Sequence, residues 1–196
     1  MSKRKATVTR NTAETQITVT VNLDGTGKAD ISTGIGFFDH MLLEVAKHGF
    51  FDLDIQVKGD LEVDDHHTVE DTGIALGQAF AKALGGKEGI RRYGSAMIPM
   101  DECLALCALD LSGRPYLVFD ADIPSETLGS MHSEMVREFF YALSYSCPMN
   151  LHLKLLYGTN SHHIAEVLFK AFARAMDAAV STDPRIEGVL STKGKL

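Results

Sequence analysis

The chain has 196 residues and a formal net charge of −7 at pH 7, from 19 basic and 26 acidic side chains. This negative balance argues against a general polyanion-binding surface, although one small phosphate site remains compatible with it. A hydrophobic share of 45 % is ordinary for a globular protein with a buried core. Eight histidines are the unusual component, and their positions decide whether they are ligands.

The sequence predicts neither a targeting signal nor a disulfide. Residues 1–5 are basic, but no apolar segment follows them, so a secretory signal peptide is not expected. No apolar run approaches the about 20 residues that a membrane-spanning helix needs. Cys103, Cys107 and Cys147 are an odd set, and we expect buried, reduced thiols. A cytoplasmic protein follows from these observations.

The predicted elements alternate between strands and helices. Residues 16–23 alternate apolar and polar side chains, which indicates a half-buried strand, and residues 24–27 form a turn. Residues 36–47 place apolar side chains on one helix face, and Gly49 ends that helix. The same criteria predict strands at 53–58, 100–111, 116–121 and 149–154, a helix at 131–145, helices that open near residues 66 and 162, and a chain break at 85–89.

The sequence repeats itself at an offset of 96 residues, because residues 53–83 align without a gap on residues 149–179. Both segments contain an alternating strand, a His-His-x-x-Glu motif and alanines spaced four residues apart. We interpret this as an internal duplication. It predicts an α+β fold with two halves, residues 1–86 and 87–196, each with helices on one face of a mixed sheet.

The two His-His-x-x-Glu motifs are candidate metal sites. On a helix, the first histidine and the glutamate of each motif share a face, whereas the second histidine points about 100° away. If the halves face each other, each ion can take a histidine and the glutamate from one repeat and the second histidine from the other. Imidazole and carboxylate together suit Mn²⁺, Fe²⁺ or Zn²⁺. The candidate ligands are His66, His67, Glu70, His162, His163 and Glu166.

Two further residues are candidates for a third protein ligand at each ion, namely His40 and Glu138. Exposed histidines at the start of a helix would explain a single motif as well as metal binding does. They do not explain two motifs in register. His48, His132 and His152 receive no ligand role from this pattern.

A second group of residues is suited to binding phosphate, because arginine, lysine and hydroxyl side chains at turns bind anions. Arg92 follows the break between the halves, Arg114 lies in a Ser-Gly-Arg-Pro turn, and Ser191 and Lys193 lie in the tail. Each of these residues alone is more often a solvated charge.

Five segments together resemble the imidazoleglycerol-phosphate dehydratase family. They are residues 33–42 (TGIGFFDHML), 65–71 (DHHTVED), 110–115 (DLSGRP), 160–166 (NSHHIAE) and 191–194 (STKG). The resemblance implies two ribosomal-protein-S5-domain-2-like halves, each with a four-stranded sheet. It also implies two Mn²⁺ ions per site and a 24-subunit homo-oligomer with its sites at subunit interfaces, without nucleic acid or membrane partners.

The resemblance also implies roles for particular residues. His40, His66, His67, Glu70, His162, His163 and Glu166 match metal ligands. Glu138 stands where some members carry a ligand histidine, so either it ligates through oxygen or that corner of the site is open to water. Arg92, Arg114, Ser191 and Lys193 match phosphate-binding positions, with His40 and His48 as further substrate-binding candidates. Glu14 matches an acidic residue that reaches a neighbouring subunit's site. Glu44 departs from members with glutamine beside the phosphate, so we expect it to turn away from the anion.

The implied reaction is dehydration of D-erythro-imidazole glycerol phosphate to imidazole acetol phosphate in histidine biosynthesis. The proton to be lost is weakly acidic, so we expect a metal-bound imidazolate to expel the hydroxyl first and give a diazafulvene-like intermediate. A carboxylate then removes the proton, and Glu14, Glu70 and Glu166 are the candidates. The ligand set alone also permits a dinuclear metallohydrolase or a metal-storage shell, and the phosphate inventory argues against storage.

Overall fold

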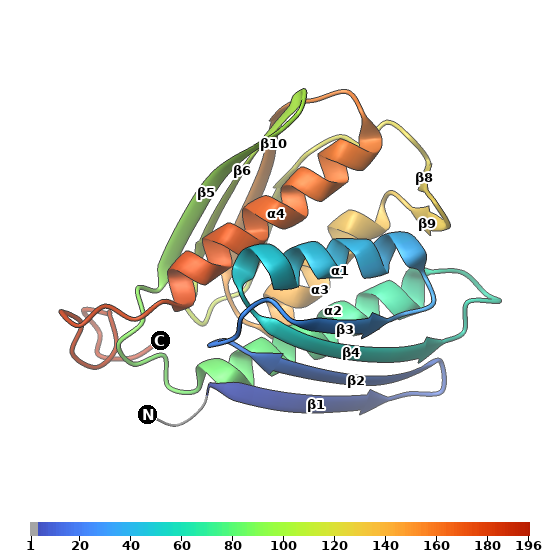
Figure 1. Cartoon of the computed structure of the whole chain (residues 1–196). Helices are drawn as coiled ribbons and strands as arrows, with labels where there is room; N and C mark the ends of the chain where they lie inside the picture. Colours follow the sequence, from blue (N-terminus) through green and yellow to red (C-terminus); the bar gives the residue numbers. More distant parts are fainter. Residues whose placement is uncertain (1–3) are drawn as a thin grey trace.

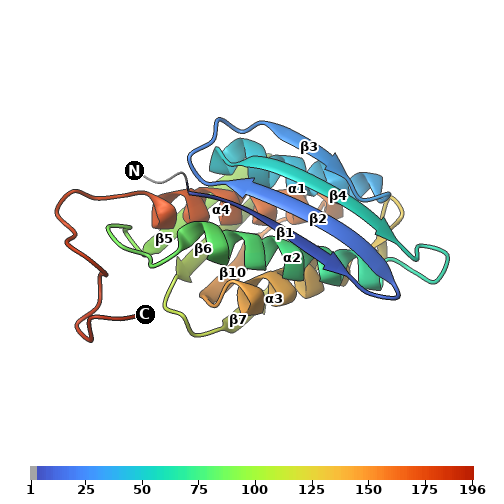
Figure 2. The same ribbon diagram turned by 90° about the horizontal axis from the view of Figure 1, so that it is seen from below.

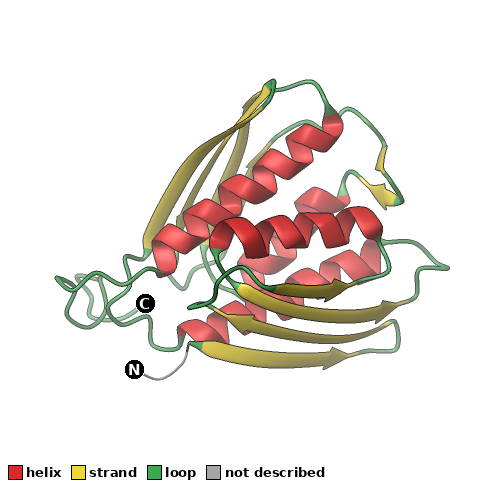
Figure 3. Cartoon of the chain, in the orientation of Figure 1, coloured by secondary structure: helices red, strands yellow, loops and turns green. Residues whose placement is uncertain are grey.

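The computed structural model describes residues 4–196, in which two four-stranded sheets enclose four helices (Figures 1 and 3). The first sheet has the strand order β1-β2-β4-β3. Its strands are β1 (Lys5–Asn11), β2 (Thr15–Asn22), β3 (Ala29–Ser32) and β4 (Asp52–Gly59). β3 pairs in parallel with β4, whereas the other pairs are antiparallel.

The second sheet repeats this arrangement with the order β5-β6-β10-β7, and β7 is parallel to β10. Its strands are β5 (Tyr93–Met100), β6 (Cys103–Asp110), β7 (Tyr116–Asp120) and β10 (Asn150–Tyr157). A small hairpin of β8 (Thr127–Leu128) and β9 (Met131–His132) follows β7. The identical topology of the two sheets agrees with an internal duplication.

The helices form the layer between the sheets, and each pair of packed helices joins the two halves. These helices are α1 (Gly36–Gly49), α2 (His66–Leu84), α3 (Met135–Ser146) and α4 (Ser161–Val180). α2 covers the first sheet and α4 the second, while α1 packs against α4 and α3 against α2. Gly73 and Gly77 allow the close approach of α2 to α3, because a Cβ there would lie 2.8 Å from the Phe139 oxygen and 2.7 Å from the Leu143 oxygen.

All four helices begin at the same end of the molecule, near β8 and β9, and run toward the end that carries the carboxyl terminus (Figures 1 and 2). The amino-terminal turns of α2 and α4 carry the two His-His-x-x-Glu motifs. The fold therefore brings both motifs to one end of the helical layer.

The predicted α+β fold with two mixed sheets is confirmed, but several boundaries differ. The helix predicted at 131–145 begins only at Met135, because Gly129 at a φ of 62° turns the chain into the β8–β9 hairpin. The strand predicted at 100–111 is β6 and begins only at Cys103, because residues 101–102 form the turn that separates it from β5. The boundary between residues 86 and 87 stays a prediction.

The three cysteines are buried and free, as predicted. None of the described helices is long and apolar enough to cross a membrane. Residues 1–3 of the basic amino-terminal segment lie outside the described part of the chain.

Candidate active site

The start of α4 fixes the second motif. The Asn160 side-chain oxygen accepts hydrogen bonds from the backbone N–H groups of His162 and His163, at 3.0 and 3.3 Å. Such a cap satisfies donors that the first helical turn otherwise leaves unpaired. The helix therefore starts at a defined residue, and the i, i+4 spacing places His162 and Glu166 on one face, as the motif predicts.

A closed group of potential ligands forms where α4 meets α1. Glu166 Oε2 lies 3.1 Å from His162 Nε2 and 3.4 Å from His40 Nε2. One ligand atom from each of the three residues lies within 4.8 Å of the other two, and the Glu166 side chain is only 8 % exposed. Two imidazoles and a buried carboxylate in this arrangement are a fitting ligand set for a divalent transition metal.

A lysine holds the other oxygen of the central carboxylate. Lys170 Nζ lies 2.6 Å from Glu166 Oε1 and 3.7 Å from Glu44 Oε2. Burial alone would raise the pKa of Glu166, but the Lys170 ammonium outweighs it and the pKa is lowered. Burial would lower the pKa of Lys170, but the two carboxylates raise it. The pair stays charged, and Glu166 keeps Oε2 available to a cation.

Glu44 turns toward α4 and its own helix. Its Oε2 lies 2.9 Å from His48 Nε2, and its Oε1 lies 3.8 Å from His40 Nδ1. Within one chain Glu44 thus faces His48 and Lys170 and is not among the residues that line the arginine-rich hollow described below.

The first motif is more open than the second. His66 Nε2 lies 3.9 Å from Glu70 Oε2, and the Glu70 side chain is 40 % exposed. Glu138, on α3, pairs instead with Arg137 at 2.7 Å. Within residues 4–196, neither Glu138 nor the first motif belongs to a group of three converging ligands.

The second histidine of each motif is held by a carboxylate. His67 Nδ1 lies 2.9 Å from Asp60 Oδ2, and His163 Nδ1 lies 2.8 Å from Glu102 Oε2. These hydrogen bonds raise the pKa of both histidines. Because Nδ1 is engaged, Nε2 is the nitrogen available to a metal. Glu14 Oε1 lies 3.8 Å from His67 Nε2.

The predicted phosphate residues line one hollow of about 890 Å³ at the opposite end of α4. Arg92, Arg114, Ser191 and Lys193 all contribute to its walls. Arg92 donates to both oxygens of Asp110 and to the backbone oxygen of Leu190, and the Asp110 contact raises its pKa. These bonds join the residue before β5 and the end of β6 to the carboxyl-terminal tail, which forms part of the hollow's wall.

The hollow and the His–Glu group are far apart within one chain. The Arg92 N–H donates to the oxygen of Ala179, near the end of α4. From Glu166 to Ala179 the helix rises about 20 Å, at about 1.5 Å per residue. A substrate with one imidazole ring, three carbons and a phosphate is shorter than this distance.

Comparison with known proteins identifies the family. The imidazoleglycerol-phosphate dehydratase family model matches residues 33–176. The chain belongs to this family. It is 63 % identical over 193 residues to the imidazoleglycerol-phosphate dehydratase of Acetivibrio thermocellus, covering 98 % of this chain and 99 % of that protein. It is 65 % identical over 191 residues to that of Lachnoclostridium phytofermentans, covering 97 % of each chain.

Two crystal structures of imidazoleglycerol-phosphate dehydratases share the fold. That from Staphylococcus aureus has a TM-score of 0.83 at 37 % identity and covers 91 % of this chain and 99 % of its own. That from Pyrococcus furiosus, in complex with (S)-C348, also has a TM-score of 0.83, at 35 % identity, and covers 96 % and 100 %. The chain is therefore a hydro-lyase of histidine biosynthesis, and the predicted activity is confirmed.

Sequence reasoning missed several residues that surround this dehydratase's candidate ligands. Lys170 could have been predicted from the sequence, because it lies four residues after Glu166 on the same helix face. Asp60 and Glu102 gave no signal, since they come from a loop and a strand turn. His132 is explained by Asp65, which accepts from its backbone N–H at 2.6 Å and lies 2.8 Å from its Nδ1.

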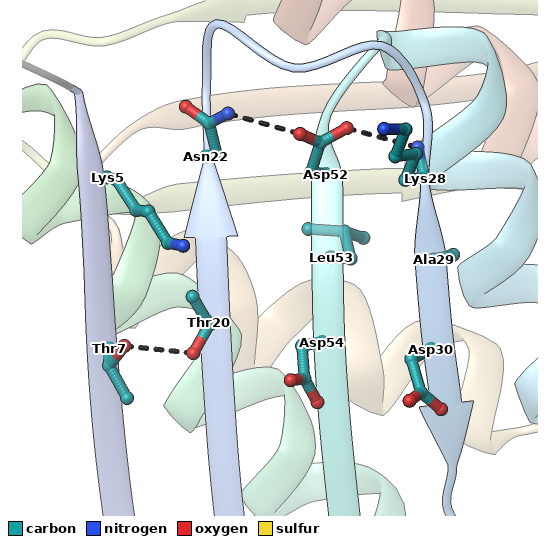
Figure 4. Close-up of a pocket in the computed structure, with 10 residues that line it drawn as sticks. All are labelled: Lys5, Thr7, Thr20, Asn22, Lys28, Ala29, Asp30, Asp52, Leu53 and Asp54. Atoms are coloured by element: carbon teal, nitrogen blue, oxygen red, sulfur yellow. Dashed lines mark hydrogen bonds between the residues drawn. The ribbon is translucent and has the colours of Figure 1, made fainter.

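A separate hollow of about 410 Å³ lies on the outer face of the first sheet (Figure 4). Thr7, Thr20 and Asp54 line it, and the two threonine hydroxyls are hydrogen-bonded to each other. None of the described residues that line this hollow is a histidine. It therefore offers the dehydratase no ligand of the kind that the motifs supply.

Proposed function

We propose that this chain converts D-erythro-imidazole glycerol phosphate to imidazole acetol phosphate at a site that holds two Mn²⁺ ions. The family supplies the reaction. The observation that carries the site is the convergence of His40, His162 and Glu166. The route through a diazafulvene-like intermediate stays a prediction.

The donor atoms support this choice of metal. Imidazole nitrogen and carboxylate oxygen are borderline-hard ligands, and Cys103, Cys107 and Cys147 are buried. We propose His40, His162 and Glu166 for one ion and His66, Glu70 and Glu138 for the other, with His67 and His163 supplied from neighbouring chains. Bound there, the metal supplies Lewis-acid stabilisation of negative charge on the imidazole ring.

The candidate carboxylates differ in how many contacts hold them, and this difference helps to identify the base that removes the carbon-bound proton. Glu166 is fixed by Lys170 and two histidines. Glu14 is half exposed, and its nearest ion-pair partner is His67 at 3.8 Å. A free carboxylate can approach a carbon-bound proton without leaving a ligand position. We therefore favour Glu14 as the base over Glu70 and Glu166, in a site to which a neighbouring chain contributes.

The separation of about 20 Å along α4 supports a site shared between chains. In this proposal, one chain contributes the phosphate hollow and another contributes the His–Glu group. The phosphate contacts hold the substrate away from the reacting carbons and so position it for proton transfer. We propose a homo-oligomer with sites at subunit interfaces, with 24 chains as the resemblance implies; the cytoplasmic location stays a prediction.

Subunit complementation tests this arrangement. Glu166→Gln and Arg114→Met should each abolish most of the turnover of imidazole glycerol phosphate. If the site is shared, assemblies co-expressed from both variants regain activity at about one quarter of their sites, because random mixing there pairs two intact surfaces. Absence of recovery in assemblies shown by mass to be mixed would refute the shared site.

The dehydratase activity and the metal have their own test. The wild-type chain should form imidazole acetol phosphate with added Mn²⁺ and lose this activity in a chelator. His67→Ala and His163→Ala should lower metal content and turnover together. A variant that remains fully active without metal would refute the dimetal proposal, and Glu14→Gln with normal turnover would refute the role of Glu14.

A further inference from the structure

A buried carboxylate on α2 joins this helix to the first two strands. Asp71 directly follows Glu70 on α2 and is only 5 % exposed. Its Oδ1 accepts two hydrogen bonds from the Arg10 guanidinium, at 3.0 and 2.7 Å. Its Oδ2 accepts a hydrogen bond from the hydroxyl of Thr15, which is itself buried. Arg10 belongs to β1 and Thr15 to β2, so one carboxylate binds both strands of this hairpin.

The turn between these strands carries Glu14 and is built on the hydroxyl of Thr12. This oxygen accepts hydrogen bonds from the backbone N–H groups of Glu14 and Thr15, at 3.1 and 2.9 Å. It also lies 3.2 Å from the Thr15 hydroxyl oxygen. Because the Thr15 hydroxyl hydrogen is donated to Asp71, the Thr12 hydroxyl is the donor in this contact. The hydrogen bonds therefore run without interruption from Asp71 through Thr15 and Thr12 to the backbone of Glu14.

The helix face that carries Asp71 also carries a candidate metal ligand. Asp71 lies four residues after His67, so the two side chains share one face of α2. On this face, His67 Nε2 lies 3.8 Å from Glu14 Oε1. The β1–β2 turn lies at the end of the molecule at which α2 begins (Figures 1 and 2). The contacts of Asp71 therefore fix the Glu14 backbone relative to the helix that carries His67.

The second half shows that the fold does not require this polar group. The offset of 96 residues and the strand registers place Val167, Ala105 and Ala96 where the first half has Asp71, Thr15 and Arg10. Val167 and Ala105 are fully buried, and Ala96 packs against the core. Buried ion pairs can often be replaced by apolar side chains without loss of stability. The polar group occurs in the half whose β1–β2 turn carries Glu14, which points to a role in positioning.

We propose that Asp71 is a positioning residue, which acts through Thr15 and Thr12 to hold Glu14 at a fixed place beside His67. This inference rests on the proposed role of Glu14 as the base. The Glu14 side chain is 52 % exposed, so its place depends on the backbone that carries it. A catalytic group that is displaced by about 1 Å can lose about 100-fold in rate, because the reaction depends on a close approach of the reacting atoms.

Substitutions of Thr15 test the proposal without removing a charge. Thr15→Val removes the hydroxyl and keeps the branched shape, whereas Thr15→Ser keeps the hydroxyl. We expect Thr15→Val to lower kcat by about 10-fold to 100-fold, with the KM for imidazole glycerol phosphate and the bound metal per chain unchanged. Thr15→Ser should restore most of kcat. Thr20→Val is the matched control, because it removes a hydroxyl that pairs with Thr7 on the opposite face of β2.

A triple variant separates positioning from stability. Arg10→Ala, Thr15→Ala and Asp71→Val together give the first half the apolar residues of the second. We expect this variant to fold, with a thermal midpoint close to that of the wild type, and to show the same loss of kcat. A variant that instead unfolds, or that folds with wild-type kcat, would overturn the proposal.

A double-mutant cycle tests whether the effect passes through Glu14. Thr15→Val should cause no further loss of kcat in a chain that already carries Glu14→Gln, because the group that it displaces is then absent. A further loss of the same size would overturn the proposal, as would wild-type kcat in Thr15→Val alone.

Backbone amide exchange at residues 12–14 gives a readout that does not depend on turnover. We expect faster exchange in Thr15→Val than in the wild type, and unchanged exchange in Thr20→Val. Equal exchange in the wild type and Thr15→Val would overturn the proposal. If exchange responds as expected but Glu14→Gln turns over normally, the role of Glu14 as the base fails, and the positioning of its backbone by Asp71 stands.

Discussion

The two His-His-x-x-Glu motifs have the same spacing but different surroundings. Glu166 is almost fully buried at the centre of a closed group of potential ligands, whereas Glu70 is 40 % exposed and 3.9 Å from its histidine. The cause lies on the neighbouring helices, since both motifs open a long helix. The duplicated motif therefore determines which side chains share a helix face. The side chains of the neighbouring helices determine how closely the ligand atoms on that face converge.

Three equivalent positions account for the contrast. His40 of α1 corresponds to Glu138 of α3, Lys170 of α4 corresponds to Ile74 of α2, and Glu44 corresponds to Ala142. The first member of each pair adds a charge or a ligand to the closed group. At the open motif, Ile74 and Ala142 add neither a charge nor a ligand. Glu138 adds a carboxylate, but this carboxylate contacts Arg137.

The largest effect is expected for Glu166→Gln. The substitution removes the central carboxylate and leaves the part-buried Lys170 ammonium with only Glu44 as a partner. We expect metal content to fall and kcat/KM to fall with it by roughly 10³-fold, because the Lewis-acid stabilisation that the metal supplies is lost. Steady-state kinetics with metal analysis check this. Glu70→Gln is the matched variant, and an equal loss of bound metal per chain in both would mean that the two sites bind metal alike.

The second-largest effect is expected when a carboxylate that orients a ligand histidine is lost. Glu102→Gln keeps the size of the side chain but removes the charge that holds His163, and we expect metal affinity to fall by roughly 10-fold to 100-fold. Competition with a fluorescent chelator measures this affinity. Asp60→Asn does the same at His67, so unchanged affinity in both variants would show that these carboxylates do not position ligands.

Lys170→Met should have an intermediate effect that depends on pH. The Lys170 pKa is raised, so the stabilisation by its ion pairs is fully present below the ordinary lysine pKa and is lost as pH rises through the folded value. We expect the variant to have a lower thermal midpoint at pH 7, with the gap narrowing as the pH rises above the ordinary lysine pKa. A gap that does not narrow as the wild-type lysine loses its proton would show that packing, and not charge, is lost.

The smallest effect is expected for Glu138→His, which gives the open motif the ligand type of the closed one. It also removes the contact with Arg137. We expect the second metal ion to bind about 3-fold to 10-fold more tightly, because imidazole suits borderline divalent metals. Isothermal titration calorimetry measures this step, and weaker binding would exclude Glu138 from the ligand sphere.

The sequence predicts local geometry well and packing poorly. Helical periodicity places His162 and Glu166 together, and strand alternation finds β4 and β10, because both depend on near neighbours. The third member of the closed group could not be assigned in this way. His40 joins the second motif because α1 packs on α4 of the other half, a contact between residues more than a hundred positions apart.

The missed features have similar causes. Glu102 reaches His163 from the turn between β5 and β6, so its role depends on strand pairing. β9 fell within the helix predicted at 131–145, but the turn at Gly129 places these residues in a hairpin with β8. In contrast, the arginines and the tail were grouped as phosphate-binding candidates from residue type and turn position, and then by family resemblance, and the structure places them around one hollow.

The crossed packing of α1 on α4 and of α3 on α2 has a consequence for the history of the chain. One helix of each half packs on the helix that covers the sheet of the other half. Between the halves, the rings of Phe38 and Phe139 lie 5.3 Å apart, measured between centroids. A separated half would therefore leave two apolar helix faces open to water. A single half would bury these faces only by pairing with a second copy, and the duplication supplies that copy permanently within one chain.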